Sequence, residues 1–369
     1  MKIERVLIMG AGPGGIAAAA GLSRRGYTVS LYNRTPERIQ PLQARGGVEI
    51  EGDIGEEFVP LAAVTTDLAQ AITGAQLIAT AVPANGQRVL IVSLLPHLRP
   101  GHMVLLMAGS AGSLEMAGLW RQAGLDLDQV LLGECTVVPY SARMVSPQRV
   151  RVKLSTEERP KRMRAAAFPG RNTAEFVERL GGMFALLPKA NVLDPGLNNP
   201  NFLIHPAPML MNYAAVERAE RHFSIMNEGM TPGTLRALDA VDAEKMALQR
   251  ALGLEVLSID DLYRETGVGP QVYRSPGEPF GLHDLTWPRY ITEDVPYGTV
   301  MFSSLGRLLG VPTPVSDSLN HVLSILEQTD FWAQGRTVER LGIAGLSVPA
   351  LQHYLHTGER LAQGERTTA

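Results

Sequence analysis

The sequence predicts an α/β protein in two parts: a doubly wound, mostly parallel sheet with its helices, followed by a mainly α-helical second half. In the first half short apolar runs alternate with helical patterns, which is typical of βαβ units. A glycine-rich turn joins the first of these runs to an alanine-rich helix. After about residue 188 the strand patterns fade and long helical windows replace them. We therefore expect domains at residues 1–188 and 189–369.

The apolar runs and the helical patterns of the first half predict its elements in order. Strands are expected at Val6–Met9, Thr28–Tyr32, Leu77–Val82, Met103–Met107, Val130–Val138, Arg149–Leu154 and Phe184–Leu187. Helices are expected at Gly15–Arg25, Asn85–Leu98, Ser113–Ala123 and Thr173–Leu180. Residues 159–172 are basic and polar, which favours a loop.

Two windows of the second half place apolar residues at helical spacing, Asp239–Leu252 and Val315–Thr329. Prolines there mark helix starts and breaks, as at Pro232, Pro312 and Pro314. Several methionines of this half are suited to a core or to a dimer face, and we favour the core. They are Met209, Met211, Met226, Met230 and Met246.

The composition excludes several classes of protein. The chain has 369 residues, with 34 Lys and Arg against 37 Asp and Glu, and 45% of its residues are hydrophobic. Such a chain folds rather than staying disordered, and the absence of a basic surplus argues against nucleic acid as a partner. One cysteine, Cys135, excludes a disulfide framework and fits a cytoplasmic protein. No histidine or cysteine spacing indicates a metal site.

The uncharged run Val6–Ser23 is long enough for a short membrane span by length alone. Its glycines and Pro13 would break a spanning helix. The lead before the run is only five residues long and contains Glu4, which does not suit a signal peptide. The run is better explained as a strand, a glycine turn and a helix, and we expect no membrane segment.

The turn at residues 10–15 has the G-x-G-x-x-G pattern of a dinucleotide-binding loop, with Pro13 and Gly14 inside it. Gly10 permits the tight turn, Gly12 lets the backbone approach a pyrophosphate, and Gly15 lets helix and strand pack closely. The N–H groups at the helix start then hold the phosphates. A glycine turn without a ligand is the alternative, but the strand–turn–helix context favours a dinucleotide.

The end of the second strand distinguishes NAD sites from NADP sites. NAD sites carry an acid there that bonds the ribose 2′-hydroxyl, whereas NADP sites accommodate the 2′-phosphate with arginine. This chain has Asn33, Arg34 and Thr35, followed by Arg38, and no acid at the tip. Arg34 can pair with a phosphate, and Asn33 and Thr35 can donate hydrogen bonds. We expect NADP(H), with NAD(H) as the alternative. The other interpretation is that Arg34 and Arg38 are solvated loop charges without a role in binding.

Two later strand ends are expected to line the rest of the cofactor path. One is Ala79–Ala84, which includes Val82 and Pro83, and the other is Met107–Gly112. Ligands of doubly wound sheets lie beyond the carboxyl ends of the strands, and small side chains there leave room for the nicotinamide ring. The alternative is that both segments are ordinary turns without a ligand, because such turns have a similar composition.

His205 is the candidate acid–base group of the second half. It stands in an apolar stretch directly before Pro206, where a helix is expected to bend or break. Histidine is suited to proton transfer near neutral pH, although a lone histidine among apolar residues is more often structural. A carboxylate of the acidic pair Glu293-Asp294, which precedes a proline turn, is placed to orient that imidazole or else is a helix-capping or surface acid. Asn201 shares the face of His205 if the turn between them is helical.

Segments spread over nearly the whole chain resemble the opine dehydrogenase family, also called octopine/nopaline dehydrogenases. The glycine loop is shared with many families, but the His-Pro, EDVPYG and C-terminal segments are much more specific together. The matching segments are GAGPGG at 10–15, MAGSAGSLE at 107–115, GEC at 133–135, NPNFLIHPAPMLMN at 199–212, RYITEDVPYG at 289–298, LGRLLGVPTP at 305–314 and GRTVERLGIAGLS at 335–347.

The resemblance implies a Rossmann domain followed by a helical substrate domain. It implies an enzyme that condenses an amino acid or amine with a 2-oxo acid and reduces the imine with NAD(P)H. It places the catalytic histidine at His205 and its acid partner at Asp294. Asn201 and Thr136 are then candidates for contacting the oxo acid or placing His205. Arg143 is a candidate carboxylate anchor, because guanidinium binds carboxylates bidentately, or else a surface charge.

The chain departs from the resemblance at two places. Some relatives have an acid after the second strand, where this chain has Asn33-Arg34, and some have Asn-Pro-Gly at 107–109. Two other functions stay open on the residues alone: a 2-oxo acid or ketopantoate-type reductase, which needs no amine, and a non-enzymatic NADP-binding sensor. In every case the expected ligands are small molecules, and we expect a homodimer in the cytoplasm.

Overall fold

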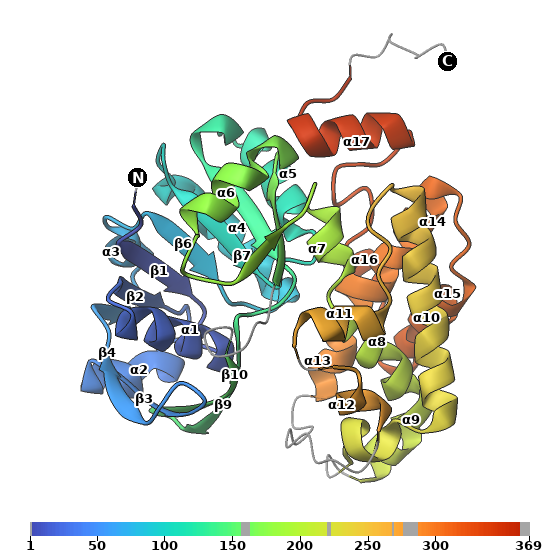
Figure 1. Cartoon of the computed structure of the whole chain (residues 1–369), viewed down its shortest axis with the longest axis horizontal. Helices are drawn as coiled ribbons and strands as arrows, with labels where there is room; N and C mark the ends of the chain where they lie inside the picture. Colours follow the sequence, from blue (N-terminus) through green and yellow to red (C-terminus); the bar gives the residue numbers. More distant parts are fainter. Residues whose placement is uncertain (1, 156–162, 220–222, 268, 276–286, 362–369) are drawn as a thin grey trace. The chain divides into compact units, whose positions relative to one another are not determined.

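The computed structural model describes residues 2–155, 163–219, 223–267, 269–275 and 287–361, which form two compact units. The N-terminal unit comprises Met1–Gly196 with Leu355–Gly358, and the C-terminal unit comprises Leu197–Tyr354 with Glu359–Ala369. The first is built around a sheet and the second is helical (Figure 1). The expected fold class is therefore confirmed. The change from strands to helices follows β12, the last strand.

The N-terminal unit is organised on an eight-stranded sheet of order β12-β11-β8-β7-β6-β1-β2-β5. Neighbouring strands from β8 to β5 all run parallel, and β11 is antiparallel to β8. This is the doubly wound arrangement that the alternating pattern predicts. The strands are β1 (Arg5–Met9), β2 (Thr28–Tyr32), β5 (Ala63–Thr65), β6 (Leu77–Thr80), β7 (Met103–Met107), β8 (Leu131–Cys135), β11 (Met163–Phe168) and β12 (Leu186–Pro188).

The helices of this unit follow the predicted ones closely, and α2, α3 and α7 are additional. Pro13 begins α1 and Pro36 begins α2. The first position of a helix is the one that tolerates proline best. The helices are α1 (Pro13–Arg24), α2 (Pro36–Arg45), α3 (Leu68–Ile72), α4 (Ala84–Leu94), α5 (Gly112–Gln122), α6 (Thr173–Arg179) and α7 (Leu193–Leu197).

A second sheet of four strands, which the sequence did not indicate, has the order β4-β3-β10-β9. Its strands are β3 (Gly47–Gly52), β4 (Glu57–Pro60), β9 (Tyr140–Ser146) and β10 (Arg149–Ser155). The strand expected at Arg149–Leu154 belongs here and not to the main sheet. Alternate apolar residues of this sheet, such as Val48 and Val150, are buried in the same core as α1. The glycine turn that opens α1 is therefore supported by both sheets.

The loop expected at 159–172 is wrong for its second part. Met163–Phe168 is the fully buried strand β11, while residues 156–162 lie outside the described chain. Arg164 explains the error, because its charge suggests a surface segment. In the structure its guanidinium is buried against the Asp194 carboxylate, with Nη1 3.0 Å from Oδ1. A buried arginine needs such a partner, and this one lies on α7.

The described part of the C-terminal unit is helical, and prolines begin several of its helices as predicted. Pro232 opens α10 and Pro314 opens α15. Met209, Met226 and Met230 are buried in the core, whereas Met211 is exposed. The helices are α8 (Asn201–Ile204), α9 (Pro206–Arg218), α10 (Pro232–Ala251), α11 (Ile259–Glu265), α12 (Gln271–Arg274), α13 (Trp287–Thr292), α14 (Val300–Leu309), α15 (Pro314–Leu326), α16 (Phe331–Gln334) and α17 (Val348–Thr357), with π-helical turns η4 (Ile225–Gly229) and η5 (Val295–Thr299).

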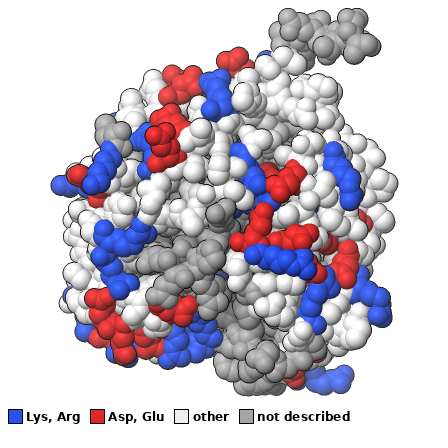
Figure 2. Space-filling view, viewed as in Figure 1, with Lys and Arg blue, Asp and Glu red and all other residues white. Residues whose placement is uncertain are grey.

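Charges of both signs are interspersed over the face seen in Figure 2. This distribution agrees with the formal net charge of −3. Among the described helices, none combines the length and the apolar character that crossing a bilayer requires. Within the same residues, no cluster of three or more His, Cys, Asp or Glu side chains is arranged to hold a metal ion.

Candidate active site

The glycine turn between β1 and α1 forms an open cradle of backbone. Gly10 has a φ of 112°, and a Cβ there would lie 2.8 Å from the Ala81 carbonyl oxygen. A Cβ on Gly15 would lie 2.0 Å from the carbonyl oxygen of Gly10. At Gly12, by contrast, a Cβ would meet nothing within 4 Å. Close packing thus requires two of these glycines, while the third leaves the backbone accessible to a ligand.

The start of α1 has the properties of an anion site. Gly12 is the N-cap and provides no side-chain cap, and the first turn holds no acidic residue. The first N–H groups of a helix have no intrahelical partner and lie at the positive end of its dipole. Gly14 completes the turn against Val138 and Tyr140. The turn from Gly10 to Gly15 therefore has the open backbone and the helix N-terminus that an anionic group requires.

Asn33 braces this cradle from the end of β2. Its Oδ1 accepts a hydrogen bond from the Ala11 N–H at 3.0 Å, and its Nδ2 donates to the Thr35 carbonyl at 3.0 Å. The Gly10 N–H also donates to the Tyr32 carbonyl, at 2.9 Å. The sequence suggested that the Asn33 side chain donates to the cofactor, but its two described hydrogen bonds are internal, and the one to Ala11 joins the ends of β1 and β2.

Arg34, Thr35 and Arg38 lie exposed at the start of α2. Neither arginine side chain has a hydrogen bond or ion pair with the part of the chain that the structure describes. Thr35 is the N-cap of α2, yet its hydroxyl does not cap the helix. The Arg34 and Arg38 side chains thus lie beside the N-terminus of α2 without a described protein partner. In doubly wound folds this is where protein side chains contact the ribose 2′-hydroxyl or 2′-phosphate.

The segment after β6 borders the turn, and the segment after β7 is strained. Val82 and Pro83 are partly buried, and Val82 Cγ1 would lie 2.9 Å from a Cβ on Gly10. After β7, three residues that are not glycine have left-handed backbones: Ala108 (φ 57°), Ser110 (φ 57°) and Ala111 (φ 61°). Such strain of the backbone is typical of ligand-binding turns.

Glu134 holds the strained turn after β7 in place. This residue was not identified as a candidate from the sequence. Its buried carboxylate accepts hydrogen bonds from the Ala111 N–H at 2.7 Å and from the Ser113 N–H at 3.0 Å. A Cβ on Gly109 would lie 2.4 Å from the Glu134 Cβ, so glycine is required there. The signal was the acid of the GEC segment, which stands in an otherwise apolar strand.

His205 and Asp294 meet inside the C-terminal unit. The His205 Nδ1 lies 2.7 Å from the Asp294 Oδ2, and the two side chains are only 11% and 7% exposed. Burial raises the pKa of the Asp294 carboxyl, and the neighbouring His205 opposes this increase. When the carboxylate is ionised and the imidazole is neutral, Nδ1 carries the hydrogen and Nε2 presents its lone pair. In the described chain Nε2 has no hydrogen-bond partner, so it is the nitrogen available to a substrate.

The local sequence explains how each partner is placed. His205 links α8 to α9, because Pro206 begins the second helix and the first ends at Ile204. The predicted break is confirmed. Asp294 lies between α13 and η5, and π-helical turns of this kind are frequent at functional sites.

Gly298 allows the two segments to approach each other. A Cβ at this position would lie 2.3 Å from the Phe202 Cδ1 on α8. The glycine of the EDVPYG segment therefore permits η5 to pack directly on α8, which brings Asp294 within hydrogen-bond distance of His205.

Tyr290 is a further contact that the sequence did not indicate. Its ring stacks on the imidazole of His205, with 3.7 Å between the ring centroids and 13° between the planes. It precedes Asp294 by four residues, the helical spacing that places two side chains on one face. That spacing within the RYITEDVPYG segment is the signal that was available.

The three residues proposed to contact the substrate lie in different surroundings. Asn201 is half-buried and lies one turn before His205. The backbone N–H of His205 donates a hydrogen bond to the Asn201 carbonyl at 3.1 Å. Thr136 is buried, and its hydroxyl donates to the Arg164 carbonyl at 3.1 Å. Arg143 lies on β9, directly opposite Arg151 of β10. Asn201 is the one that the structure brings to His205, whereas Thr136 and Arg143 belong to the N-terminal unit.

The fold and these residues define a two-domain dehydrogenase that uses a nicotinamide dinucleotide. Residues 5–117 match the NAD-binding domain of 6-phosphogluconate dehydrogenase. Residues 188–326 match the α-helical domain of NAD/NADP octopine/nopaline dehydrogenase. The chain is 31% identical to the opine dehydrogenase of Arthrobacter sp. (strain 1C), over 94% of this chain and 97% of that protein. The chain therefore belongs to the opine dehydrogenase family and is an NAD(P)H-dependent oxidoreductase acting on CH–NH donors.

Other relatives agree with this assignment. The chain is 26% identical to the protein ocs of Agrobacterium tumefaciens (strain Ach5), covering 96% of this chain and 99% of that one. A structure of octopine dehydrogenase with NADH and L-arginine superposes with a TM-score of 0.72 at 18% identity, covering 97% of this chain and 98% of that one. A structure of yersinopine dehydrogenase with NADP⁺ gives a TM-score of 0.66 at 18% identity, covering 96% and 98%. These structural neighbours share the fold.

The close contact at Gly298 leads to a prediction about stability. We expect Gly298→Ala to lower the free energy of unfolding by about 1–3 kcal/mol, because the added methyl group overpacks the interface with Phe202. Adding Phe202→Leu should recover part of this loss, since it removes the ring atoms in the way. Urea unfolding of both single variants and the double variant measures the coupling.

Gly233→Ala is the matched control, because a Cβ there would lie at least 3.8 Å from its neighbours. Strictly additive effects of Gly298→Ala and Phe202→Leu would show that the contact does not determine the packing.

Proposed function

We propose that His205 is the general acid–base group of the reaction and that Asp294 orients it. The observation that carries this proposal is the buried contact of 2.7 Å between Nδ1 and Oδ2, which leaves Nε2 for the substrate. An imidazole fixed at one nitrogen by a carboxylate accepts a proton at the other, and the carboxylate stabilises the imidazolium that results.

We propose an amino acid or amine and a 2-oxo acid as the substrates. Structures of octopine dehydrogenase contain L-arginine, pyruvate and agmatine, which are compounds of these classes. The amine nitrogen attacks the carbonyl carbon, and the C–N bond forms as Nε2 of His205 takes a proton from the nitrogen. His205 delivers that proton to the former carbonyl oxygen, which becomes the hydroxyl of a carbinolamine. A second proton, which Nε2 takes up from solvent, then goes to this hydroxyl, and the C–O bond breaks as water leaves and the nitrogen lone pair forms the C=N bond. The imine carbon that remains is the hydride acceptor.

The backbone from Gly10 to Gly15 would hold the dinucleotide pyrophosphate, and Val82 and Pro83 would border the path towards the nicotinamide. The reduced nicotinamide supplies the hydride when bound. The protein orients the two substrates and stabilises charge at the reacting carbon and nitrogen. Asn201, whose amide makes no described side-chain hydrogen bond, is suited to bind the oxo acid beside His205.

We propose that NADP(H) is preferred over NAD(H). Arg34 and Arg38 are exposed at the start of α2, and the tip of β2 carries Asn33 where NAD sites have an acid. Asn33 is engaged with Ala11 and Thr35, so the 2′-phosphate would be bound chiefly by Arg34 and the N-terminus of α2. The homodimer and the cytoplasmic location inferred from the sequence stay predictions.

The proposed substrates lead to a test on the wild-type enzyme. We expect oxidation of NADPH with a 2-oxo acid to require an amino acid or amine, and the product mass to equal the two substrates joined, less one oxygen atom. The measurement is the loss of reduced-nicotinamide absorbance across panels of oxo acids, with and without amines, together with mass spectrometry. Amine-independent oxidation giving a hydroxy acid would favour the ketopantoate-type alternative.

The proposed role of His205 predicts that His205→Ala lowers kcat by about 10²- to 10⁴-fold, the usual contribution of an acid–base group. NADPH binding, followed by fluorescence titration, should be retained, because the cradle belongs to the other unit. Asp294→Asn should lower kcat in the same direction. His356→Ala, at an exposed histidine of α17, is the control. Wild-type turnover by His205→Ala would remove this residue from the mechanism.

The proposed cofactor preference predicts a selective effect of Arg34→Ala. We expect kcat/KM for NADPH to fall about 10- to 100-fold, because a charged hydrogen-bond partner of the phosphate is lost. The value for NADH should change little, so the same protein provides its own reference. Arg236→Ala, at an exposed arginine of α10, controls for net charge. Equal losses with both cofactors, or a wild-type preference for NADH, would contradict the assignment.

A further inference from the structure

The imidazole of His205 is held on its face as well as at its edge. The ring of Tyr290 lies 3.7 Å away, centroid to centroid, and nearly parallel to it. Asp294 contacts the edge of the same imidazole at Nδ1. Tyr290 and Asp294 belong to one stretch of chain, formed by α13 and η5. A single stretch of chain therefore supplies both contacts.

The two contacts restrict different motions of the imidazole. The hydrogen bond fixes the position of Nδ1 but still lets the ring rock about the line from Nδ1 to Oδ2. An aromatic face in van der Waals contact opposes that rocking. Nε2 is then fixed in direction as well as in position. The same face stabilises an imidazolium, because a cation over an aromatic ring is attracted by its quadrupole.

We propose that Tyr290 is a positioning residue for the acid–base chemistry of His205, and that it acts through the face of its ring. This inference rests on the proposed role of His205 and extends it to a third residue. Tyr290 is half-buried, unlike the fully buried aromatic residues of this unit such as Phe202 and Phe302. Its ring lies at the site and is not enclosed in the core.

Two further tyrosines, Tyr263 of α11 and Tyr273 of α12, belong to the same unit as Tyr290. Burial raises the pKa of the Tyr263 hydroxyl, and the electrostatic effect of Tyr290 acts in the same direction. The Tyr263 ring contacts the Tyr273 ring, with 4.8 Å between the centroids and 51° between the planes. This ring contact joins α11 to α12.

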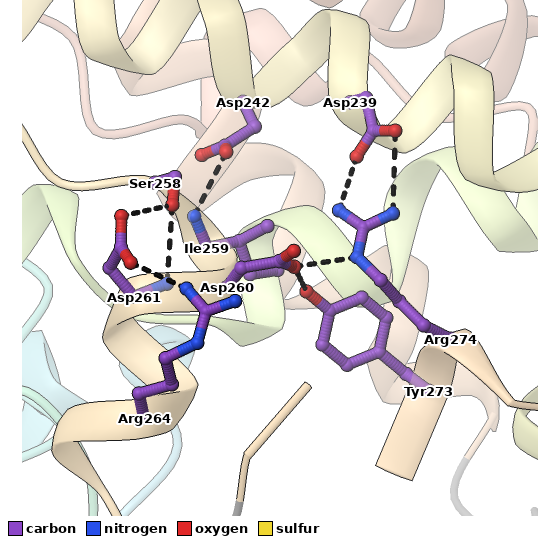
Figure 3. A network of polar contacts seen from close by, with 9 residues as sticks. All are labelled: Asp239, Asp242, Ser258, Ile259, Asp260, Asp261, Arg264, Tyr273 and Arg274. Carbon is purple, nitrogen blue, oxygen red and sulfur yellow. Dashed lines mark hydrogen bonds and ion pairs between the residues drawn. The ribbon is translucent and has the colours of Figure 1, made fainter. Parts of the chain in front are cut away.

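Charged groups fix α12 and α11 to α10 (Figure 3). Arg274 pairs with Asp239 of α10 and with Asp260 of α11, with nitrogen–oxygen distances of 2.6 Å in both pairs. The Asp260 carboxylate also accepts a hydrogen bond from the Tyr273 hydroxyl. One carboxylate therefore joins the arginine and the tyrosine of α12 to α11, the helix that carries Tyr263.

The test compares two substitutions in the full-length enzyme. Tyr290→Phe keeps the ring face and removes the hydroxyl, whereas Tyr290→Leu removes the face. We expect Tyr290→Leu to lower kcat about 10- to 100-fold, the scale of a small misplacement of a reacting group, without changing the KM for NADPH. Tyr290→Phe should keep kcat within about threefold of the wild type, because the stack remains.

Controls separate positioning from a general loss of structure. Tyr213→Leu removes a half-buried tyrosine elsewhere in the same unit and should leave kcat unchanged. Thermal unfolding shows whether each variant folds, and Tyr290→Met replaces Tyr290→Leu if the latter does not. Wild-type kcat in a folded variant without the ring face would overturn the proposal. Equal losses in Tyr290→Phe and Tyr290→Leu would assign the effect to the hydroxyl and would also overturn it.

A second readout does not depend on turnover. In protein with ring-labelled histidine, the Hε1 signal of His205 is identified by its absence in His205→Ala. Stacking should shift this signal upfield in the wild type and in Tyr290→Phe, and Tyr290→Leu should abolish the shift. An unshifted signal in the wild type would overturn the stack itself. Full activity in His205→Ala would defeat the proposed function instead, so the two failures are distinguishable.

Discussion

The hydrogen bond between His205 and Asp294 is the contact on which the C-terminal half of the site depends. The two residues are far apart in the sequence, and both are nearly buried. Burying a carboxylate is costly unless a partner compensates for the lost hydration, and the imidazole is that partner. The surrounding unit must therefore bring α8 and η5 into contact within a narrow tolerance. Gly298 meets this requirement, because any side chain would strike Phe202.

The N-terminal unit solves a different problem, which is to keep backbone groups accessible while holding them in place. Gly12 leaves its part of the turn open, and the turns on either side are tied down by side chains. Asn33 fixes the glycine turn to β2, and Glu134 fixes the strained turn after β7. Both side chains satisfy backbone N–H groups that would otherwise need water or a ligand. The polar residues nearest the predicted cofactor are thus partly structural.

Local patterns were sufficient for much of the fold. The strand ending at Met9, the glycine turn and the helix after it are specified by neighbouring residues, and the structure agrees. Prediction failed where a residue depends on a distant partner. Arg164 made β11 look like a loop, because the compensating Asp194 lies on another element. The four-stranded sheet was also missed, since the pairing of β3 with β10 joins segments that are remote in the sequence.

For the site, the sequence by itself determined which chemistry is available. The glycine spacing indicated a dinucleotide, and His205 before a proline, with an acid in the EDVPYG segment, indicated an acid–base pair. The tertiary structure decided which atoms meet: Nδ1 with Oδ2, and the face of Tyr290 with the imidazole. It also showed that Asn33 and Thr136 are bonded within the protein. Residue types and spacings are local properties, whereas a hydrogen bond or a ring stack depends on how separate helices pack, which no short segment encodes.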